Sequence, residues 1–339
     1  MIADGKRDFS LDFVKGLLVV LMLTFHTGSL FLADSQRLWI LDEVLLNFVS
    51  GSWVFLSGYL VAVRYGNGAR SDISGARKHL MLRGAKLIGI YALLNVGIAG
   101  LRVNPGFIGH FDIPTIARTI FYGGGETASF GVLLGIGYFL ICAPFFLYLQ
   151  HKTGMFTWFL LIGSSIGSLV LIVIPPNLWL ILCGLAGMAF GFWFNAAKIT
   201  RMTRTTVRLT LLLIFSLAGA ATHYSLLFMS AVTRDNLFVY LLGVVSMVTL
   251  FYIAHRWCQP HSYIDEGLRL LGRYSLICYV LQMGILWGLW CLMSLLAITV
   301  SFTPALATSL LVLIVIVWLM DRLISEHQAF KKVYGYAFH

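Results

Sequence analysis

The residues of this sequence with the clearest chemical potential are Lys15 and His26, which belong to its first long apolar run. An ionisable side chain inside a membrane helix is costly and needs a functional or structural reason. The two residues are eleven positions apart, close to three turns of an α-helix, so they project from one face about 16 Å apart along the axis. His26 could remove a proton from a hydroxyl that arrives from the outer side, because imidazole titrates near working pH. An interhelical hydrogen bond is the structural alternative, and position alone favours neither.

A second group of candidates is the basic pair Arg83 and Lys86, which follows Arg77 and Lys78. Guanidinium and ammonium groups at the cytoplasmic mouth of a helix can bind the phosphates of a nucleotide-bearing donor. The same side chains can equally anchor the chain at the inner membrane surface. Both interpretations stay open at the level of sequence.

Polar and aromatic residues within other apolar runs are candidates for a substrate path. Ser57 is expected nearer the cytoplasmic face than His26, so we interpret Ser57 and Gly58 as small residues that let helices approach or that line a narrow passage. His223 is expected at a depth similar to that of His26, where it either relays protons or serves a structural role. The predicted path comprises Trp53, Ser57, Tyr59, Glu126, Tyr279 and Gln282.

The composition places these candidates in a multi-pass membrane protein. The chain has 339 residues, of which 59% are hydrophobic and only 11% charged, and its mean hydropathy is +0.87. Apolar runs of about 20 residues favour membrane helices over a barrel, which would show shorter alternating segments. The net charge of +10 could suggest nucleic acid, but the placement of the charges indicates membrane topology instead. The five cysteines occur singly and match neither a zinc site nor a disulfide framework.

The apolar runs predict an all-α bundle of about ten transmembrane helices that forms one domain over residues 1–339. With a cytoplasmic N-terminus, the outer connections hold only Arg37, Arg102, Arg118 and Arg234 of the 24 lysines and arginines. This excess of basic residues on the inner side predicts that both termini are cytoplasmic. The expected helices are at about 12–33, 42–65, 84–101, 129–149, 156–174, 178–197, 209–231, 237–254, 272–296 and 305–323.

Two connections are long enough to do more than join helices. The inner one, at about 66–83, is basic and contains glycine, so it could cradle a polyanion. The outer one, at about 102–128, contains Glu126 next to three consecutive glycines, which permit backbone geometries that other residues resist. We interpret this outer connection as a candidate lid or re-entrant segment.

Several motifs occur in a characteristic order. Residues 7–16 read RDFSLDFVKG and are followed by His26, and residues 53–59 read WVFLSGY. Less specific motifs follow at 83–86, 137–140 and 271–275. This order resembles the bacterial integral-membrane acyltransferases, namely the acyltransferase-3 family and the related periplasmic glucan succinyltransferase type. The similarity spans most of the chain, although only the first two motifs are specific.

The resemblance implies a ten-helix enzyme of the bacterial inner membrane that moves an acyl group, by default acetyl, from cytoplasmic acyl-CoA to a hydroxyl of an extracytoplasmic glycan. It implies that His26 acts as general base or transient acyl carrier, while Lys15, Arg83 and Lys86 hold the donor. Lys15 replaces the arginine of many members, which disfavours bidentate phosphate binding. Gln282 replaces a frequent histidine, which implies the loss of a catalytic partner in that helix.

Two other classes of function compete with the enzyme. A transporter or flippase for a glycan or a lipid-linked sugar would use intramembrane polar residues as its path, but such proteins often contain inverted repeats and none is evident here. A non-catalytic membrane partner of a polysaccharide synthase would have no need for an aligned cation and histidine. The acyl group, the glycan acceptor and the oligomeric state are not specified by the sequence.

Overall fold

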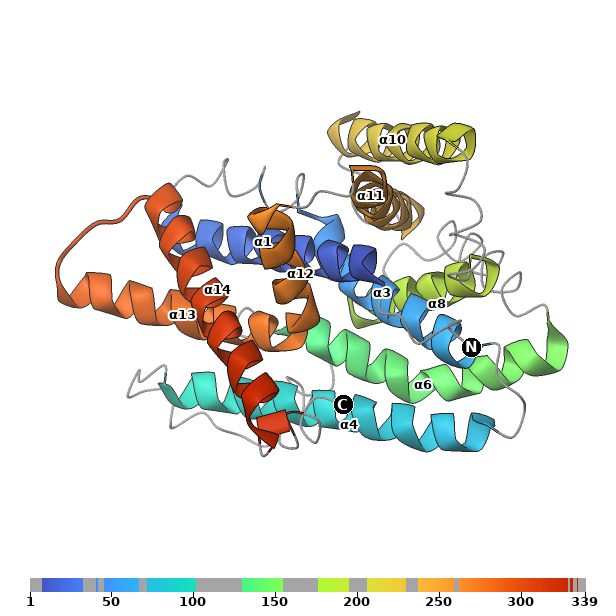
Figure 1. Cartoon of the computed structure of the whole chain (residues 1–339), viewed down its shortest axis with the longest axis horizontal. Helices are drawn as coiled ribbons and strands as arrows, with labels where there is room; N and C mark the ends of the chain where they lie inside the picture. The colour runs from blue at the N-terminus through green and yellow to red at the C-terminus, as the bar shows by residue number, and fades with distance from the viewer. Residues whose placement is uncertain are drawn as a thin grey trace. The chain divides into compact units, whose positions relative to one another are not determined.

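The computed structural model describes residues 8–32, 41, 46–66, 72–101, 130–154, 176–194, 206–229, 237–258, 262–328, 330–331 and 334. These residues form ten α-helices and no strand (Figure 1). The helices are α1 (Phe9–Phe31), α3 (Phe48–Tyr65), α4 (Asp72–Leu101), α6 (Gly131–Thr153), α8 (Pro176–Trp193), α10 (Thr206–Met229), α11 (Leu237–Cys258), α12 (Tyr263–Arg273), α13 (Ser275–Leu295) and α14 (Phe302–Glu326).

Six of the described helices, namely α1, α6, α10, α11, α13 and α14, are long and apolar enough to cross a membrane. This supports the predicted class, a helical membrane protein. Nine of the predicted helices overlap helices of the structure. The remaining one, at 156–174, and the outer connection at 102–128 lie outside the described residues.

The predicted loop at 66–83 is wrong over residues 72–83, because α4 begins at Asp72 and runs for 30 residues. Its buried residues recur along one face, with Ala76, Leu80, Leu87 and Tyr91 at most 5% exposed. This spacing puts the buried residues on one face of the helix, and the first three turns also carry several charged residues, which lower their mean hydropathy. Mean hydropathy underestimates such a helix, which explains why its first three turns were missed.

The chain divides into two compact units, and the division falls within α3 and α11. One unit covers 1–5, 50–202 and 235–241, and the other covers 6–49, 203–234 and 242–339.

In the first unit, α4 and α6 lie side by side (Figure 1). Gly84 and Gly137 allow this approach, since a Cβ on Gly84 would press on the Gly137 carbonyl and on Ile141. α3 and α8 approach in the same way, because a Cβ on Gly58 would overlap the Gly184 backbone. Close contacts between glycine-bearing surfaces are typical of helices that associate in membranes.

In the second unit, α1 packs against α12, α13 and α14. Asp8 caps α1, since its carboxylate accepts hydrogen bonds from the backbone N–H groups of Ser10 at 3.0 Å and Leu11 at 3.4 Å. α14 lies across α13 and contacts it (Figure 1). Figure 1 also shows the short helix α12 beside α1.

The sequence did not predict α12 as a separate helix. Ser262 caps it by accepting a hydrogen bond from the Asp265 backbone N–H at 3.2 Å, and two acidic residues occupy its first turn. The helix ends at Arg273, and Tyr274 has non-helical backbone angles that separate α12 from α13. With only 11 residues, α12 is too short to span a bilayer and escapes a search for long apolar runs.

Candidate functional sites

Lys15 and His26 lie on α1, which is uninterrupted from Phe9 to Phe31. Eleven residues of α-helix rotate the chain by about 20° beyond three full turns, so both side chains start from the same face. The Lys15 Nζ lies 3.9 Å from the Asp12 Oδ1, and the Lys15 side chain is 20% exposed. His26 is partly buried, and its ring meets the edge of Phe25 with centroids 5.0 Å apart. One helix face of the second unit therefore carries both a cation and an imidazole.

Arg83 and Lys86 belong to the first unit, where His79, Arg83 and Lys86 recur at positions i, i+4 and i+7 of α4. This spacing puts them on one helix face. All three are partly buried, whereas Arg77 and Lys78 are exposed. Arg64, in the last turn of α3, extends the group, since its charge acts on His79. We refer to Arg64, His79, Arg83 and Lys86 as the basic stripe.

The basic stripe changes the protonation of its histidine. Partial burial lowers the pKa of His79 below its usual value, and the positive charges of Arg64, Arg83 and Lys86 lower it further. His79 is therefore neutral near pH 7 and gains its charge only at lower pH. An anion bound among these side chains would oppose this shift and favour the protonated ring.

The predicted path residues of the first unit lie on α3. Trp53 is 8% exposed, and its indole Nε1 is buried without a hydrogen-bond acceptor among the described residues. The Ser57 hydroxyl donates to the Trp53 carbonyl at 2.9 Å. Its proton therefore goes to the backbone of its own helix and not to a general base, as an activated nucleophile would require. Tyr59 is 4% exposed and packs on Phe190 with ring centroids 6.3 Å apart.

The predicted path residues of the second unit lie on α13, where Tyr279 and Gln282 are buried. His223, on α10, is also buried and packs against Tyr224 with ring centroids 5.1 Å apart. A Cβ on Gly243 would press on the His223 ring, so α10 and α11 enclose it tightly. Glu126 lies outside the described residues.

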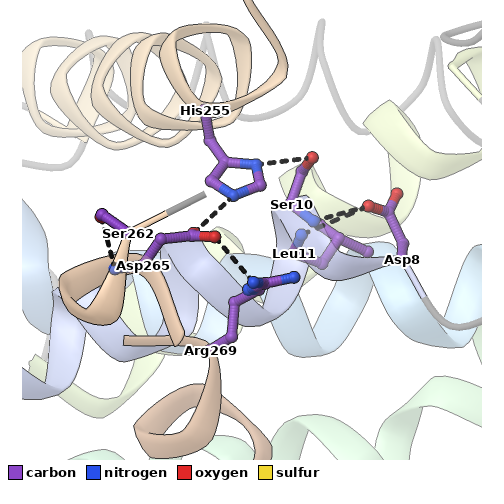
Figure 2. Close-up of polar contacts among 7 residues, drawn as sticks. All are labelled: Asp8, Ser10, Leu11, His255, Ser262, Asp265 and Arg269. Atoms are coloured by element: carbon purple, nitrogen blue, oxygen red, sulfur yellow. Dashed lines mark hydrogen bonds and ion pairs between the residues drawn. The ribbon is translucent and has the colours of Figure 1, made fainter. Parts of the chain in front are cut away.

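A buried polar network that sequence reasoning missed joins α1, α11 and α12 (Figure 2). The His255 Nδ1 lies 3.0 Å from the Ser10 Oγ, and its Nε2 lies 2.8 Å from the Asp265 Oδ1. The other carboxylate oxygen of Asp265 lies 2.8 Å from the Arg269 guanidinium. Ser10, His255 and Asp265 are 4%, 8% and 2% exposed. We refer to Ser10, His255, Asp265 and Arg269 as the inner network.

In the inner network, serine contacts histidine and histidine contacts aspartate. This is the arrangement of a hydrogen-bond relay in which serine donates to histidine and histidine donates to aspartate. A nucleophilic serine must also reach a substrate and an oxyanion-binding donor. Ser10 is buried, and Asp8 occupies the backbone N–H groups of Ser10 and Leu11 that could have stabilised an oxyanion. The described geometry therefore favours a structural connection between three helix ends over a hydrolytic site.

Aromatic contacts enclose the inner network. Phe13 stacks on His255 with centroids 4.4 Å apart, and the Arg269 guanidinium lies 5.3 Å from the centroid of Phe9. Tyr252 adds a link between α11 and α1, because its hydroxyl donates to the Asp8 Oδ2 at 3.1 Å. The local sequence signals for this arrangement lie in α12, namely the cap formed by Ser262 and Asp265 and the Asp265–Arg269 pair four residues apart, whereas the contacts of His255 with Ser10 and Asp265 join different helices.

Comparisons of the chain with protein-family models, with curated proteins and with solved structures found no match.

Proposed function

We propose that this chain is a membrane O-acyltransferase that moves an acyl group from cytoplasmic acyl-CoA to a hydroxyl of an extracytoplasmic glycan. In this proposal His26 deprotonates the acceptor hydroxyl or carries the acyl group transiently. Lys15, Arg83 and Lys86 bind the donor phosphates. The proposed location is the bacterial inner membrane with both termini in the cytoplasm, and acetyl is the proposed acyl group.

The observation that carries this proposal is the uninterrupted helix α1, with Lys15 and His26 on one face. Acyl-CoA has phosphates at one end and a thioester at the other. A site for it needs a cation near the phosphates and a base near the thioester, separated by the length of the arm. A separation of about 16 Å suits an extended thioester arm better than a compact substrate. An imidazole that carries no charge at neutral pH can accept the proton of a hydroxyl.

The basic stripe supports the donor part of the proposal. Acyl-CoA carries three phosphates, and phosphates bind best where several cationic donors converge. Between residues 60 and 100 the chain has six lysines and arginines but a single acidic residue, Asp72. Arg83 and Lys86 are partly buried, which restricts their side chains and favours a defined site over diffuse attraction.

The chemical step is a transfer that needs no external oxidant or reductant. The acceptor oxygen attacks the thioester carbonyl carbon, its proton goes to the His26 imidazole, and the carbon–sulfur bond breaks to release the CoA thiolate. Protonated His26 can then return its proton to the thiolate. An acyl-histidine intermediate would instead give ping-pong kinetics.

The experiment that tests the proposal measures acyl-CoA binding and release of free CoA by the purified protein in lipid. We expect turnover by the wild type with a glycan acceptor and none by His26→Ala, which should still bind acyl-CoA. His327→Ala, which changes an exposed histidine, is the matched control and should remain active. An active His26→Ala protein would remove His26 from the mechanism.

The donor site is tested with paired charge changes on the same helix. Arg83→Ala with Lys86→Ala should weaken acyl-CoA binding at least tenfold, since the lost phosphate contacts together contribute at least about 1.4 kcal/mol. Arg77→Ala with Lys78→Ala removes the same charge from exposed positions of α4 and should have a small effect. If the wild type binds no acyl-CoA at all, the enzyme proposal fails and transport assays take its place.

A further inference from the structure

The junction of α13 and α14 contains polar groups that the proposed mechanism does not use. Gln282 is 0% exposed, and neither its Nε2 nor its Oε1 has a hydrogen-bond partner among the described residues. Ser309 is also 0% exposed, and its Oγ has no partner among them. Both residues lie in the second unit.

The position of Ser309 makes its unsatisfied hydroxyl unusual. Several other helical hydroxyls donate to the carbonyl four residues earlier, as Thr27 does at 2.7 Å, Ser57 at 2.9 Å and Ser216 at 2.8 Å. Such a bond is the default for serine or threonine in an apolar helix. Ser309 is instead free to serve a partner that is not part of its own helix.

Both side chains lie on the buried faces of helices that contact each other and α1. Most residues of α13 and α14 are exposed or partly exposed, and the fully buried ones mark the faces that pack on each other and on α1. On α13 the fully buried residues are Cys278, Gln282 and Leu286. On α14 they are Ala305, Ser309, Leu313 and Val317, which recur at every fourth position. Gln282 and Ser309 therefore lie on the buried faces of two helices that pack on each other and on α1.

Leaving these groups unsatisfied is unfavourable, because a buried amide or hydroxyl without a partner loses its hydration and gains nothing in return. A leucine at position 282 would fill similar space without this cost. The polar groups thus indicate a ligand that supplies the missing hydrogen bonds. Residues 275–295 and 302–320 contain no charged side chain, so a charged ligand would find no counter-charge along these two segments.

We propose that Gln282 and Ser309 bind an uncharged, amide-bearing chain, namely the pantetheine arm of the acyl-CoA donor. This inference rests on the proposed function and adds to it the site for the arm. The carboxamide of Gln282 can donate to the carbonyl and accept from the N–H of a ligand amide. The Ser309 hydroxyl can donate to a second carbonyl.

The test uses two probes, CoA and adenosine 3′,5′-bisphosphate, with the purified full chain in lipid; the bisphosphate lacks the arm and one of the three phosphates. We expect Gln282→Leu to weaken CoA binding about tenfold and to leave the bisphosphate unchanged, since the phosphates are held elsewhere. Ser309→Ala should weaken CoA binding about threefold. Leu313→Met, a volume-conserving change on the same buried face, is the control and should bind both probes as the wild type does.

Thermal unfolding without ligand supplies a second readout. Gln282→Leu should raise the unfolding temperature of the ligand-free protein, because it removes an unsatisfied buried amide. A lowered unfolding temperature would mean that the amide has a structural partner, and would overturn the proposal.

The binding outcomes separate this inference from the proposed function. If the wild type binds CoA and Gln282→Leu binds it equally well, only the assignment of Gln282 and Ser309 fails. Equal weakening of CoA and the bisphosphate would also overturn it, because the arm would not be the recognised group. If the wild type binds neither probe, the proposed function fails and this inference fails with it.

Discussion

Among single residues, the described part of the second unit contains both buried polar groups that are hydrogen-bonded and buried polar groups that are not. In the inner network the Asp265 carboxylate has partners on both oxygens, and His255 has partners on both ring nitrogens. Gln282 has none among the described residues. Paired groups such as these hold a structure together, whereas unpaired groups in a packed interior cost stability and indicate a role beyond folding.

The inner network should be sensitive to loss of its central charge. Asp265→Asn leaves Arg269 and His255 without their carboxylate and should lower the free energy of unfolding by about 3 kcal/mol. Ser10→Ala removes one hydrogen bond and should cost about 1 kcal/mol. Thermal unfolding in detergent measures both variants, and a smaller loss for Asp265→Asn than for Ser10→Ala would contradict this ranking.

The basic stripe should bind polyanions more tightly as the pH falls. The pKa of His79 is lowered in the free protein, so the ring is neutral at pH 7.5 and becomes charged at more acidic pH. A bound polyanion favours the charged ring, so binding of adenosine 3′,5′-bisphosphate should strengthen between about pH 7.5 and pH 5.5.

His79→Gln is the control for this pH dependence, because the phosphates of the probe titrate in the same range for both proteins. Calorimetry at the two pH values should show a larger gain for the wild type than for His79→Gln. Equal gains would mean that His79 takes no part in the binding of the anion.

At the scale of helices, the contact between α1 and α12 depends on glycine at the positions where two backbones meet. A Cβ on Gly272 would overlap the Asp12 carbonyl, and a Cβ on Gly16 would overlap the Leu268 carbonyl. The backbone of α12 therefore lies against the first turns of α1, next to Lys15. Because Asp12 pairs with Lys15, α12 also influences where that cation lies.

Two glycines of α12 provide a matched test of this contact. Gly272→Ala should destabilise the protein by about 1–3 kcal/mol, because the new methyl group meets backbone that does not yield easily. A Cβ on Gly267 would meet nothing within 4 Å, so Gly267→Ala should stabilise the helix by about 0.5–1 kcal/mol. Thermal unfolding of the two variants measures the difference, and shifts of the same sign would refute the assigned packing.

At the scale of the whole molecule, the sequence predicted the class of fold because long apolar runs have few alternatives in lipid. It located α1, α13 and α14 to within a few residues, but it missed the first turns of α4 and all of α12. The first turns of α4 were missed because their charged and polar residues lower the mean hydropathy, and α12 was missed because it is short and amphipathic. Lys15 and His26 could be related from sequence because one helix fixes their spacing.

The inner network could not be predicted in the same way. Ser10 and His255 are 245 residues apart, and only packing brings them together. The sequence did single out Gln282, but its lack of partners depends on three helices at once. The basic stripe falls between these cases, because α4 sets the spacing of His79, Arg83 and Lys86, while Arg64 joins them from another helix.

The predicted topology is testable on the intact chain. A fluorescent protein fused after His339 should fluoresce in cells, and alkaline phosphatase fused there should be inactive, since we expect a cytoplasmic C-terminus. A fusion within the segment 102–128 should give the opposite pattern. An active phosphatase at the C-terminus would invert the assignment of inner and outer sides.

The outward-facing apolar surface of α14 has a consequence for the lipid around the protein. From Phe302 to Met320 this helix has no charged side chain, and the Arg322 guanidinium lies over the ring of Trp318, 4.6 Å from its centroid. These 19 residues span about 28 Å, close to the hydrocarbon thickness of an ordinary bilayer, and paired tryptophan and arginine mark its edge. In thinner membranes α14 would have to tilt against α13. The length of the lipid acyl chains would therefore change how α13 and α14 pack around Gln282 and Ser309.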